Sequence, residues 1–228
     1  MIDRNALRAQ SDASAKREAV TSARAQFFKA LDGLRLGYKQ TTILRLFKDG
    51  GHYVEEGTTS IKLAGMAAEV RKMATPLSPE LRPFSEWHGS RDSGHTVQGI
   101  DITFDWPDIN KQEELRRRIS EPGLKEICDA IITGIHYSGE RAQAAISMMQ
   151  TKCEARARGG FDSASVMTLQ PLIDFSYPAG SNEYGTKVQP EWLGLAAMIV
   201  WKGLAKDNPT LEPVGAGRSS YYNIVVAW

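Results

Sequence analysis

Cysteines and long apolar runs are both scarce in this 228-residue chain. The two cysteines, Cys128 and Cys153, fall on apolar phases of predicted helices, which indicates buried free thiols and a reducing compartment rather than a disulfide framework. The longest apolar stretch, residues 192–201, is well short of the roughly 20 residues that span a bilayer. No apolar segment typical of a secretory signal follows Met1. We therefore expect no membrane contact and a cytoplasmic or virion location, without secretion by a signal peptide.

Net charge is also nearly absent, because 28 Lys and Arg residues stand against 27 Asp and Glu residues. This balance excludes a protein that coats a polyanion through one global basic field. The charge is unevenly distributed: residues 1–75 hold 13 basic and 8 acidic residues, residues 76–135 hold 7 and 11, and residues 136–228 hold 8 of each. Basic and acidic segments in one chain suit a subunit that meets copies of itself or a charged partner. Random variation of surface charge is the alternative explanation.

Recognisable catalytic and cofactor motifs are missing as well. The chain has no Gly-x-Ser-x-Gly elbow, and the glycine-rich run at 215–220 precedes a predicted strand rather than the helix that a phosphate loop requires. His88 and His95 have no cysteine near them in sequence to complete a zinc site. The sequence therefore predicts no catalytic residue, no metal site and no cofactor.

Carboxylates beside a predicted strand leave one enzymatic alternative open. Asp101 and Asp105 stand where a metal-dependent enzyme could hold its ion. Strict alternation with apolar neighbours places both on the solvent face of that strand, which favours plain surface carboxylates.

Hydrophobic periodicity predicts an α+β fold, with an N-terminal helical arm and a small helical subdomain, then helices packed on a small, mainly antiparallel sheet. We place the arm at residues 1–24, the helical subdomain at 25–75 and the α+β domain at 87–228. Three prolines predict a linker over 75–86. The individual elements expected are helices at 21–37, 40–48 and 58–72, a strand at 96–106 paired across 89–94, helices at 124–135 and 142–153, a strand at 173–177, a helix at 190–205 and a strand at 221–228.

The arm has almost no large apolar side chain, so a helix formed there has nothing to bury against its own core. Such a segment is frayed in solution or ordered by a neighbour. At the other end, the 190–205 helix is apolar on nearly every face and the chain closes on an aromatic strand, which indicates a core or a subunit interface. The residues expected at that interface are Trp192, Trp201, Tyr221, Tyr222 and Trp228.

Residues 37–73 combine a short amphipathic run, a Gly50-Gly51 pair and a second helix opened by Thr and Ser. This segment loosely resembles helix-turn-helix segments of small plasmid and phage DNA-binding proteins. The resemblance implies that Lys62, Arg71 and Lys72 face nucleic acid. Acidic Glu55 and Glu56 depart from that pattern, because they would repel phosphate.

Together these features predict a non-enzymatic structural or assembly subunit, a virus- or phage-particle-like component that forms a homo-oligomer or larger assembly. The alternatives are a nucleic-acid-binding protein that uses the basic first third and an enzyme with a carboxylate site. The residues expected to bind a partner or nucleic acid are Arg4, Arg8, Lys16, Arg17, Arg24, Lys62, Arg71 and Lys72.

Overall fold

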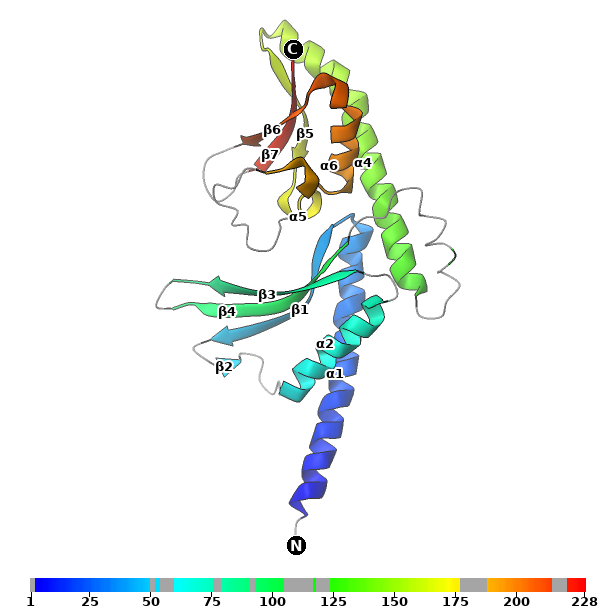
Figure 1. The fold of residues 1–228 in the computed structure, drawn as a ribbon, viewed down its shortest axis with the longest axis vertical. Helices are drawn as coiled ribbons and strands as arrows, with labels where there is room; N and C mark the ends of the chain where they lie inside the picture. The colour runs from blue at the N-terminus through cyan, green and yellow to red at the C-terminus, as the bar shows by residue number, and fades with distance from the viewer. Residues whose placement is uncertain are drawn as a thin grey trace. The chain divides into compact units, whose positions relative to one another are not determined.

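A computed structural model describes residues 3–49, 52–53, 60–75, 79–90, 93–104, 117, 124–176, 188–214 and 221–228 of the chain (Figure 1). Helices and sheets are mixed, which confirms the predicted α+β class. The chain forms two compact units: unit 1 holds residues 1–33 and 41–105, and unit 2 holds residues 34–40 and 106–228. The predicted division at residues 24, 75 and 87 stays a prediction.

Helix α1, Arg4–Arg35, begins at a side-chain cap. The Asp3 Oδ1 atom accepts hydrogen bonds from the backbone N–H groups of Asn5 and Ala6, at 3.0 and 3.1 Å. An aspartate in this position satisfies amide groups that have no partner within the helix. At the other end, Gly37 adopts a left-handed conformation with φ of 80°, which ends the helix. Apolar residues at helical spacing are buried only from Ala19 onward.

The second element of unit 1 is a strand, so the helix predicted over 40–48 is wrong. Strand β1, Gln40–Asp49, includes the β-branched run Thr41, Thr42 and Ile43, which suits a pleated backbone. Ile43 and the adjacent Leu44 are both buried. Short apolar runs do not distinguish a strand from a helix, and pairing within the sheet decided the outcome.

Helix α2, Ser60–Ala74, confirms the helix predicted after residue 58. It packs on α1 through Gly65, where an added Cβ atom would lie 3.0 Å from the Cβ of Ala19. The buried side chains of α2 include Met66, Val70 and Ala74. The absence of a side chain at Gly65 therefore permits the close approach of the two helices.

A long hairpin completes unit 1. Strands β3, Glu80–His88, and β4, His95–Thr103, pair antiparallel from Glu80 opposite Thr103 to His88 opposite His95. The predicted strand and its partner across 89–94 are thereby confirmed, whereas the linker predicted over 75–86 is wrong from residue 80. With the short β2, His52–Tyr53, the sheet has the order β2-β1-β4-β3. Pro83 is tolerated because β3 is an edge strand.

Unit 2 is built around helix α4, Lys125–Arg158, a single helix where two were predicted. Gly139 does not interrupt it. The other elements are β5 Ser163–Leu169, α5 Pro171–Asp174, η3 Pro190–Trp192, α6 Leu195–Gly203, η4 Ala205–Asp207, β6 Thr210–Val214 and β7 Tyr221–Ala227. Strand β7 confirms the predicted terminal strand and lies between β5 and β6, antiparallel to both.

Two predicted elements of unit 2 need correction. The strand expected at 173–177 is the short helix α5 followed by a single bridge from Phe175 to Leu193. The helix expected from Pro190 begins only at Leu195, after a 3₁₀ turn. The reason is a close contact at Gly194, whose N–H donates to the Asp174 carbonyl oxygen at 2.5 Å and where a side chain would strike the backbone of α5. That contact holds the chain extended between the two turns.

The described core of unit 2 is apolar and also contains a buried ion pair. Leu169, Val200 and Ile224 are fully buried between α4, α6 and the sheet. Asp174 is also fully buried, and its two carboxylate oxygens accept hydrogen bonds from Arg141 at 2.9 and 3.0 Å. Burial lowers the pKa of Arg141, but the hydrogen bonds and charge of Asp174 outweigh it, so the net shift of this pKa is upward. The guanidinium group of Arg141 therefore stays charged inside the fold.

Candidate functional site

The first turns of α1 are exposed on all sides. Residues 3–11 are exposed without exception, and the side chain of Leu7 is 55% exposed. Burial against the rest of unit 1 begins only at Ala19. This segment is the start of the predicted polar arm, here in helical form, and its first two turns or so are exposed on every side.

Basic side chains project from this arm. Arg4, Arg8, Lys16 and Arg17 are exposed, and within the described part of the chain none of these four side chains forms an ion pair or a hydrogen bond. Arg24 differs, because its Nε atom donates to the Glu69 carboxylate at 3.0 Å. Arg24, predicted as a partner-binding residue, thus joins α1 to α2.

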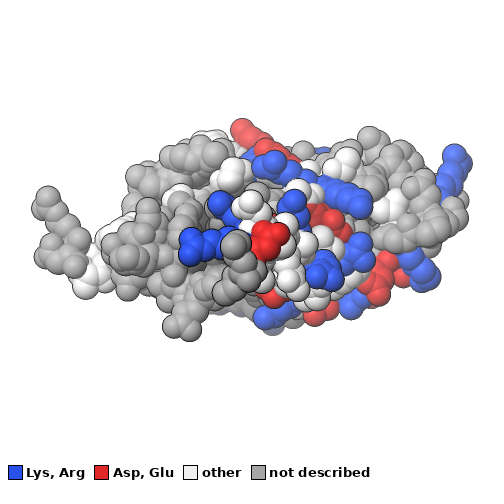
Figure 2. All heavy atoms as spheres, turned by 90° about the horizontal axis from the view of Figure 1, so that it is seen from below, with Lys and Arg blue, Asp and Glu red and all other residues white. Residues whose placement is uncertain are grey.

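The predicted helix-turn-helix segment is not formed, because its first helix is strand β1. On α2, Arg71 and Lys72 are exposed in the last turn, and the side chain of Lys62 lies outside the described residues. Figure 2 shows Lys and Arg side chains interspersed with Asp and Glu on the face that it draws. The charges on that face therefore do not form one continuous field of a single sign.

The aromatic residues predicted at an interface divide into two groups. Trp192, Trp201 and Tyr222 are half-buried and pack against the core of unit 2. The Tyr222 ring meets the Phe175 ring edge to face, with centroids 5.6 Å apart. Trp228 is 54% exposed, and the side chain of Tyr221 lies outside the described residues. Three of the predicted interface residues therefore serve the fold, and Trp228 lies on the surface.

The carboxylate expected on the solvent face of β4 is buried, so that expectation is wrong for Asp101. Its Oδ1 atom accepts a hydrogen bond of 2.6 Å from the hydroxyl of Thr42 on β1. Asp105 lies outside the described residues. Across the part of the chain that is described, no cluster of His, Cys, Asp and Glu could hold a metal ion.

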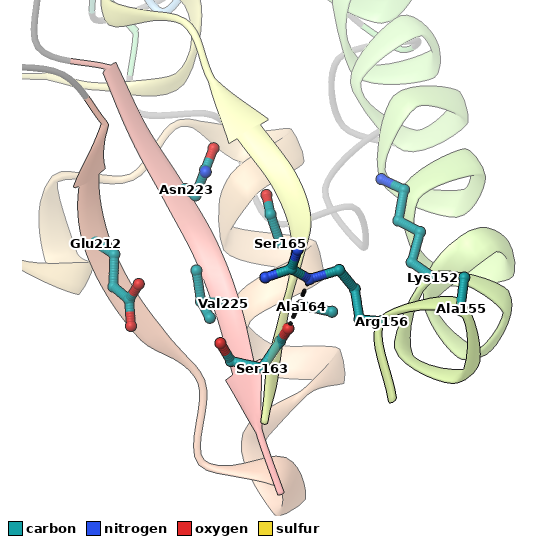
Figure 3. Close-up of a pocket in the computed structure, with 9 residues that line it drawn as sticks. All are labelled: Lys152, Ala155, Arg156, Ser163, Ala164, Ser165, Glu212, Asn223 and Val225. Carbon is teal, nitrogen blue, oxygen red and sulfur yellow. Dashed lines mark hydrogen bonds between the residues drawn. The ribbon is translucent and has the colours of Figure 1, made fainter. Parts of the chain in front are cut away.

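A pocket of about 480 Å³ lies where α4 meets the sheet of unit 2 (Figure 3). On its α4 side, the Lys152 Nζ atom donates to the Val166 carbonyl oxygen at 2.9 Å, and the Arg156 Nε atom donates to the Ser163 carbonyl oxygen at 3.1 Å. Both cations thus satisfy carbonyl groups of β5. The other residues that line the pocket are Ala155, Ala164, Ser165, Glu212, Asn223 and Val225.

These lining residues bring together no nucleophile and base. Ser165 is hydrogen-bonded to no His, Asp or Glu among the described residues, and the Asn223 Oδ1 atom is buried without a partner there. Acyl transfer needs a base within hydrogen-bond reach of the nucleophile. The pocket is therefore a polar recess in which no described serine hydroxyl is hydrogen-bonded to a base.

The cysteines are free thiols, as predicted. Cys128 is buried, whereas Cys153 is half-buried. Burial raises the pKa of the Cys153 thiol, and the negative charge of Asp207 raises it further. A raised pKa lowers the fraction of reactive thiolate near neutral pH.

The sequence predicted a partner strand across residues 89–94, but not that this strand, β3, lies at the edge of its sheet. Its Trp87 is 57% exposed, and its charged side chains Arg82 and Glu86 stand in a row with Glu80 and His88. Of the residues in β3, only Trp87 indicated a contact surface from the sequence, because tryptophan is enriched at protein interfaces.

No protein-family model, no curated protein and no solved structure matches this chain. None of the helices in the described ranges combines the length and the apolar character needed to cross a membrane.

Proposed function

We propose that this chain is a non-enzymatic assembly subunit that self-associates, and that the first turns of α1 contact a second copy of the chain. The observation that carries the proposal is the exposure of residues 3–11 on every side of the helix. A helical segment of this kind contributes nothing to the core of its own unit, so a contact with another chain is the role left to it.

Helix energetics support a partner for this segment. The first turns belong to the 32-residue helix α1 and need no nucleation of their own, but most helical stability in proteins comes from tertiary packing, which residues 3–11 lack. Ala6, Ala9 and Ala13 fall on one face at helical spacing, and small side chains let a second helix approach closely. Leu7 supplies an exposed apolar side chain on a different face of the same helix, about 100° around the axis from Ala6. A second copy would bury this surface and hold the segment helical.

The experiment measures molar mass by light scattering over a wide range of protein concentration, for the full chain and for a chain lacking residues 1–11. We expect the full chain to exceed the monomer mass and the deletion to lower the associated fraction. Leu7→Asp is the point variant, and Met148→Asp on α4 is its control, because both side chains are 55% exposed. Leu7→Asp should weaken association while Met148→Asp leaves it unchanged. A full chain that stays monomeric at every concentration contradicts the proposal.

A second candidate function is nucleic-acid binding, favoured by the exposed cations of α1 and α2. Arg71 and Lys72 of α2 join the four basic side chains of the arm, and among the described residues none of the six is neutralised by an ion pair. Unpaired surface cations attract phosphate with an affinity that falls steeply with salt. Fluorescence anisotropy of labelled DNA and RNA at low salt tests this candidate. Binding should weaken for Arg71→Glu with Lys72→Glu but not for Lys202→Glu on α6, and an absence of binding at low salt contradicts it.

A further inference from the structure

The outer edge of β3 pairs with no strand in the part of the chain that is described. In the sheet order β2-β1-β4-β3, strand β3 is terminal and only β4 neighbours it. Pro83, Ser85, Glu86, Trp87 and His88 are all exposed. A strand edge that stays open presents N–H and C=O groups on which another strand can pair.

Pro83 determines which backbone groups point outward. A proline has no N–H group, so it fits an antiparallel ladder where its nitrogen points away from the neighbouring strand. Pro83 lies opposite Ile100 of β4. Because alternate residues of a strand point their backbone groups to opposite sides, Leu81, Ser85 and Trp87 also direct N–H and C=O groups outward. The residues between them, at 82, 84 and 86, direct theirs toward β4.

The side chains of β3 complement a reversed copy of the same strand. If the strand is paired antiparallel with itself about Phe84, Arg82 lies opposite Glu86 of the other copy. Glu80 then lies opposite His88, so an acidic residue again meets a residue that can carry positive charge. Opposite charges at directly opposed positions stabilise a pair of strands, and like charges destabilise it.

The other face of the strand is complementary in a different way. In the same register, Leu81 lies opposite Trp87 of the other copy, on both sides of the centre. The indole of Trp87 lies against Gly94, where an added Cβ atom would collide with it, so the ring is held in place while 57% of the residue is exposed. A tryptophan fixed in this manner loses little side-chain freedom on binding and is a frequent contact residue in interfaces.

We propose that β3 pairs antiparallel with β3 of a second copy about a two-fold axis through Phe84, which joins two sheets into one continuous sheet. This inference rests on the proposed self-association and names one surface that carries it. Each strand donates from Leu81, Ser85 and Trp87 to the other. Pro83 leaves the Ser85 carbonyl of the other copy without a donor, and the remaining outward groups from Leu81 to Trp87 all find partners.

The intrachain ion pairs of β3 are compatible with this arrangement. Arg82 donates to Glu80 at 2.7 Å, and His88 lies 3.2 Å from Glu86 within the same strand. In the paired strands, Arg82 lies near Glu80 of its own strand and Glu86 of the other copy, and Glu86 lies near His88 of its own strand and Arg82 of the other copy. Acidic residues therefore neighbour Arg82 or His88 both along each strand and between the two strands.

Charge reversal tests the register directly. Arg82→Glu places a second carboxylate opposite Glu86 on both sides of the axis, and Glu86→Arg places a second guanidinium opposite Arg82 in the same way. Each variant alone should raise the dissociation constant for self-association by about tenfold. An equimolar mixture of the two variants has opposite charges at both positions, so it should associate as heterodimers about as tightly as the original chain. Lys125→Glu, an exposed charge reversal on α4, is the control and should change nothing.

A second variant guards against loss of folding. Ser85→Pro removes an outward N–H group while leaving the ladder to β4 intact, so it should weaken association with circular dichroism unchanged. Two different results would contradict the proposed pairing, and they separate its failure from that of self-association. If the original chain is monomeric, the proposed function fails as well. If it associates and neither the reversals nor Ser85→Pro change its association, only the β3 pairing is overturned.

Discussion

In the sheet of unit 2, each outer strand has features that hinder the addition of a further strand, whereas the outer strand β3 in unit 1 has fewer of them. On β5, Lys152 and Arg156 of α4 donate to the carbonyl groups of Val166 and Ser163. The opposite strand β6 is short, Thr210–Val214, and contains Pro213. Side-chain caps, short length and proline are all devices that block strand addition.

Strand β3 carries only one of these devices. It has nine residues, and Pro83 removes a single outward donor. Among the described residues, no basic side chain of a helix donates to the outward carbonyl groups of Leu81, Ser85 and Trp87. The sheet of unit 2 is thus better protected against strand addition than the outer edge of β3, which is expected where that edge serves a contact.

The largest expected effect concerns the protected unit 2. Asp174→Ala removes the partner of the half-buried Arg141 and should lower the free energy of unfolding by about 3 kcal/mol. The loss should be the same at every protein concentration, because the ion pair lies within one chain. Denaturant unfolding followed by circular dichroism measures it. Asp129→Ala, which removes an exposed ion pair with Lys125, is the control and should leave the unfolding midpoint unchanged.

A smaller effect is expected at the base of the open strand. Gly99 of β4 lies under the ring of Phe84, and an added Cβ atom would collide with that ring and with the Leu44 carbonyl oxygen. Gly99→Ala should destabilise unit 1 by about 2 kcal/mol and weaken self-association through the displaced β3. Gly139→Ala on α4, where nothing lies within 4 Å of the added atom, should instead stabilise the protein by about 0.5–1 kcal/mol. Equal effects of the two changes on the denaturant midpoint would contradict this expectation.

Removing a side-chain hydrogen bond from the edge strand β5 should lower the free energy of unfolding by a smaller amount. Lys152→Met removes the hydrogen bond to the Val166 carbonyl group and should cost about 1 kcal/mol. Because β5 then resembles β3, the variant should also aggregate faster in a turbidity assay. Lys202→Met on α6 changes charge equally without opening an edge. If both variants aggregate at the same rate, the cap on β5 has no protective role.

The smallest effect is a pH dependence at Glu80. The hydrogen bond from Arg82 holds the pKa of this carboxyl below its ordinary value of 4.5. A carboxyl with a lowered pKa in the folded state adds stability above its unfolded pKa, and this contribution is lost as pH falls through the folded pKa. Glu80→Gln should therefore flatten slightly the acid dependence of the melting temperature below pH 4.5. Solvent screening keeps the change small, and a steeper dependence in the variant would contradict the assignment.

Helical stripes and the alternating strand were predictable from the sequence, because each depends on local periodicity. The stripe from Leu124 to Cys153 marks α4, and alternation at Ile100 and Ile102 marks β4. Strand β1 was not predictable, since Ile43 and Leu44 fit either period. In such a run, contacts made after folding decide the conformation.

Among the candidate surfaces, too, those that depend on local sequence were predictable and those that depend on tertiary contacts were not. The polarity of residues 2–25 predicted an arm without a core contact of its own. The burial of Asp101 depends on Thr42, which is 59 residues away in the chain. The open edge of β3 depends on strand order, which no local pattern encodes. Charge complementarity within residues 80–88 becomes meaningful only once that edge is known.

Residue-resolved amide hydrogen exchange at low and high protein concentration tests the pairing of β3 most directly. We predict that the amides of Leu81, Ser85 and Trp87 exchange fast in dilute protein and become protected as concentration rises. Arg82 and Glu86, bonded to β4, should be protected at both concentrations. Exchange at Leu81, Ser85 and Trp87 that stays fast in protein shown by light scattering to be associated would contradict the proposed pairing.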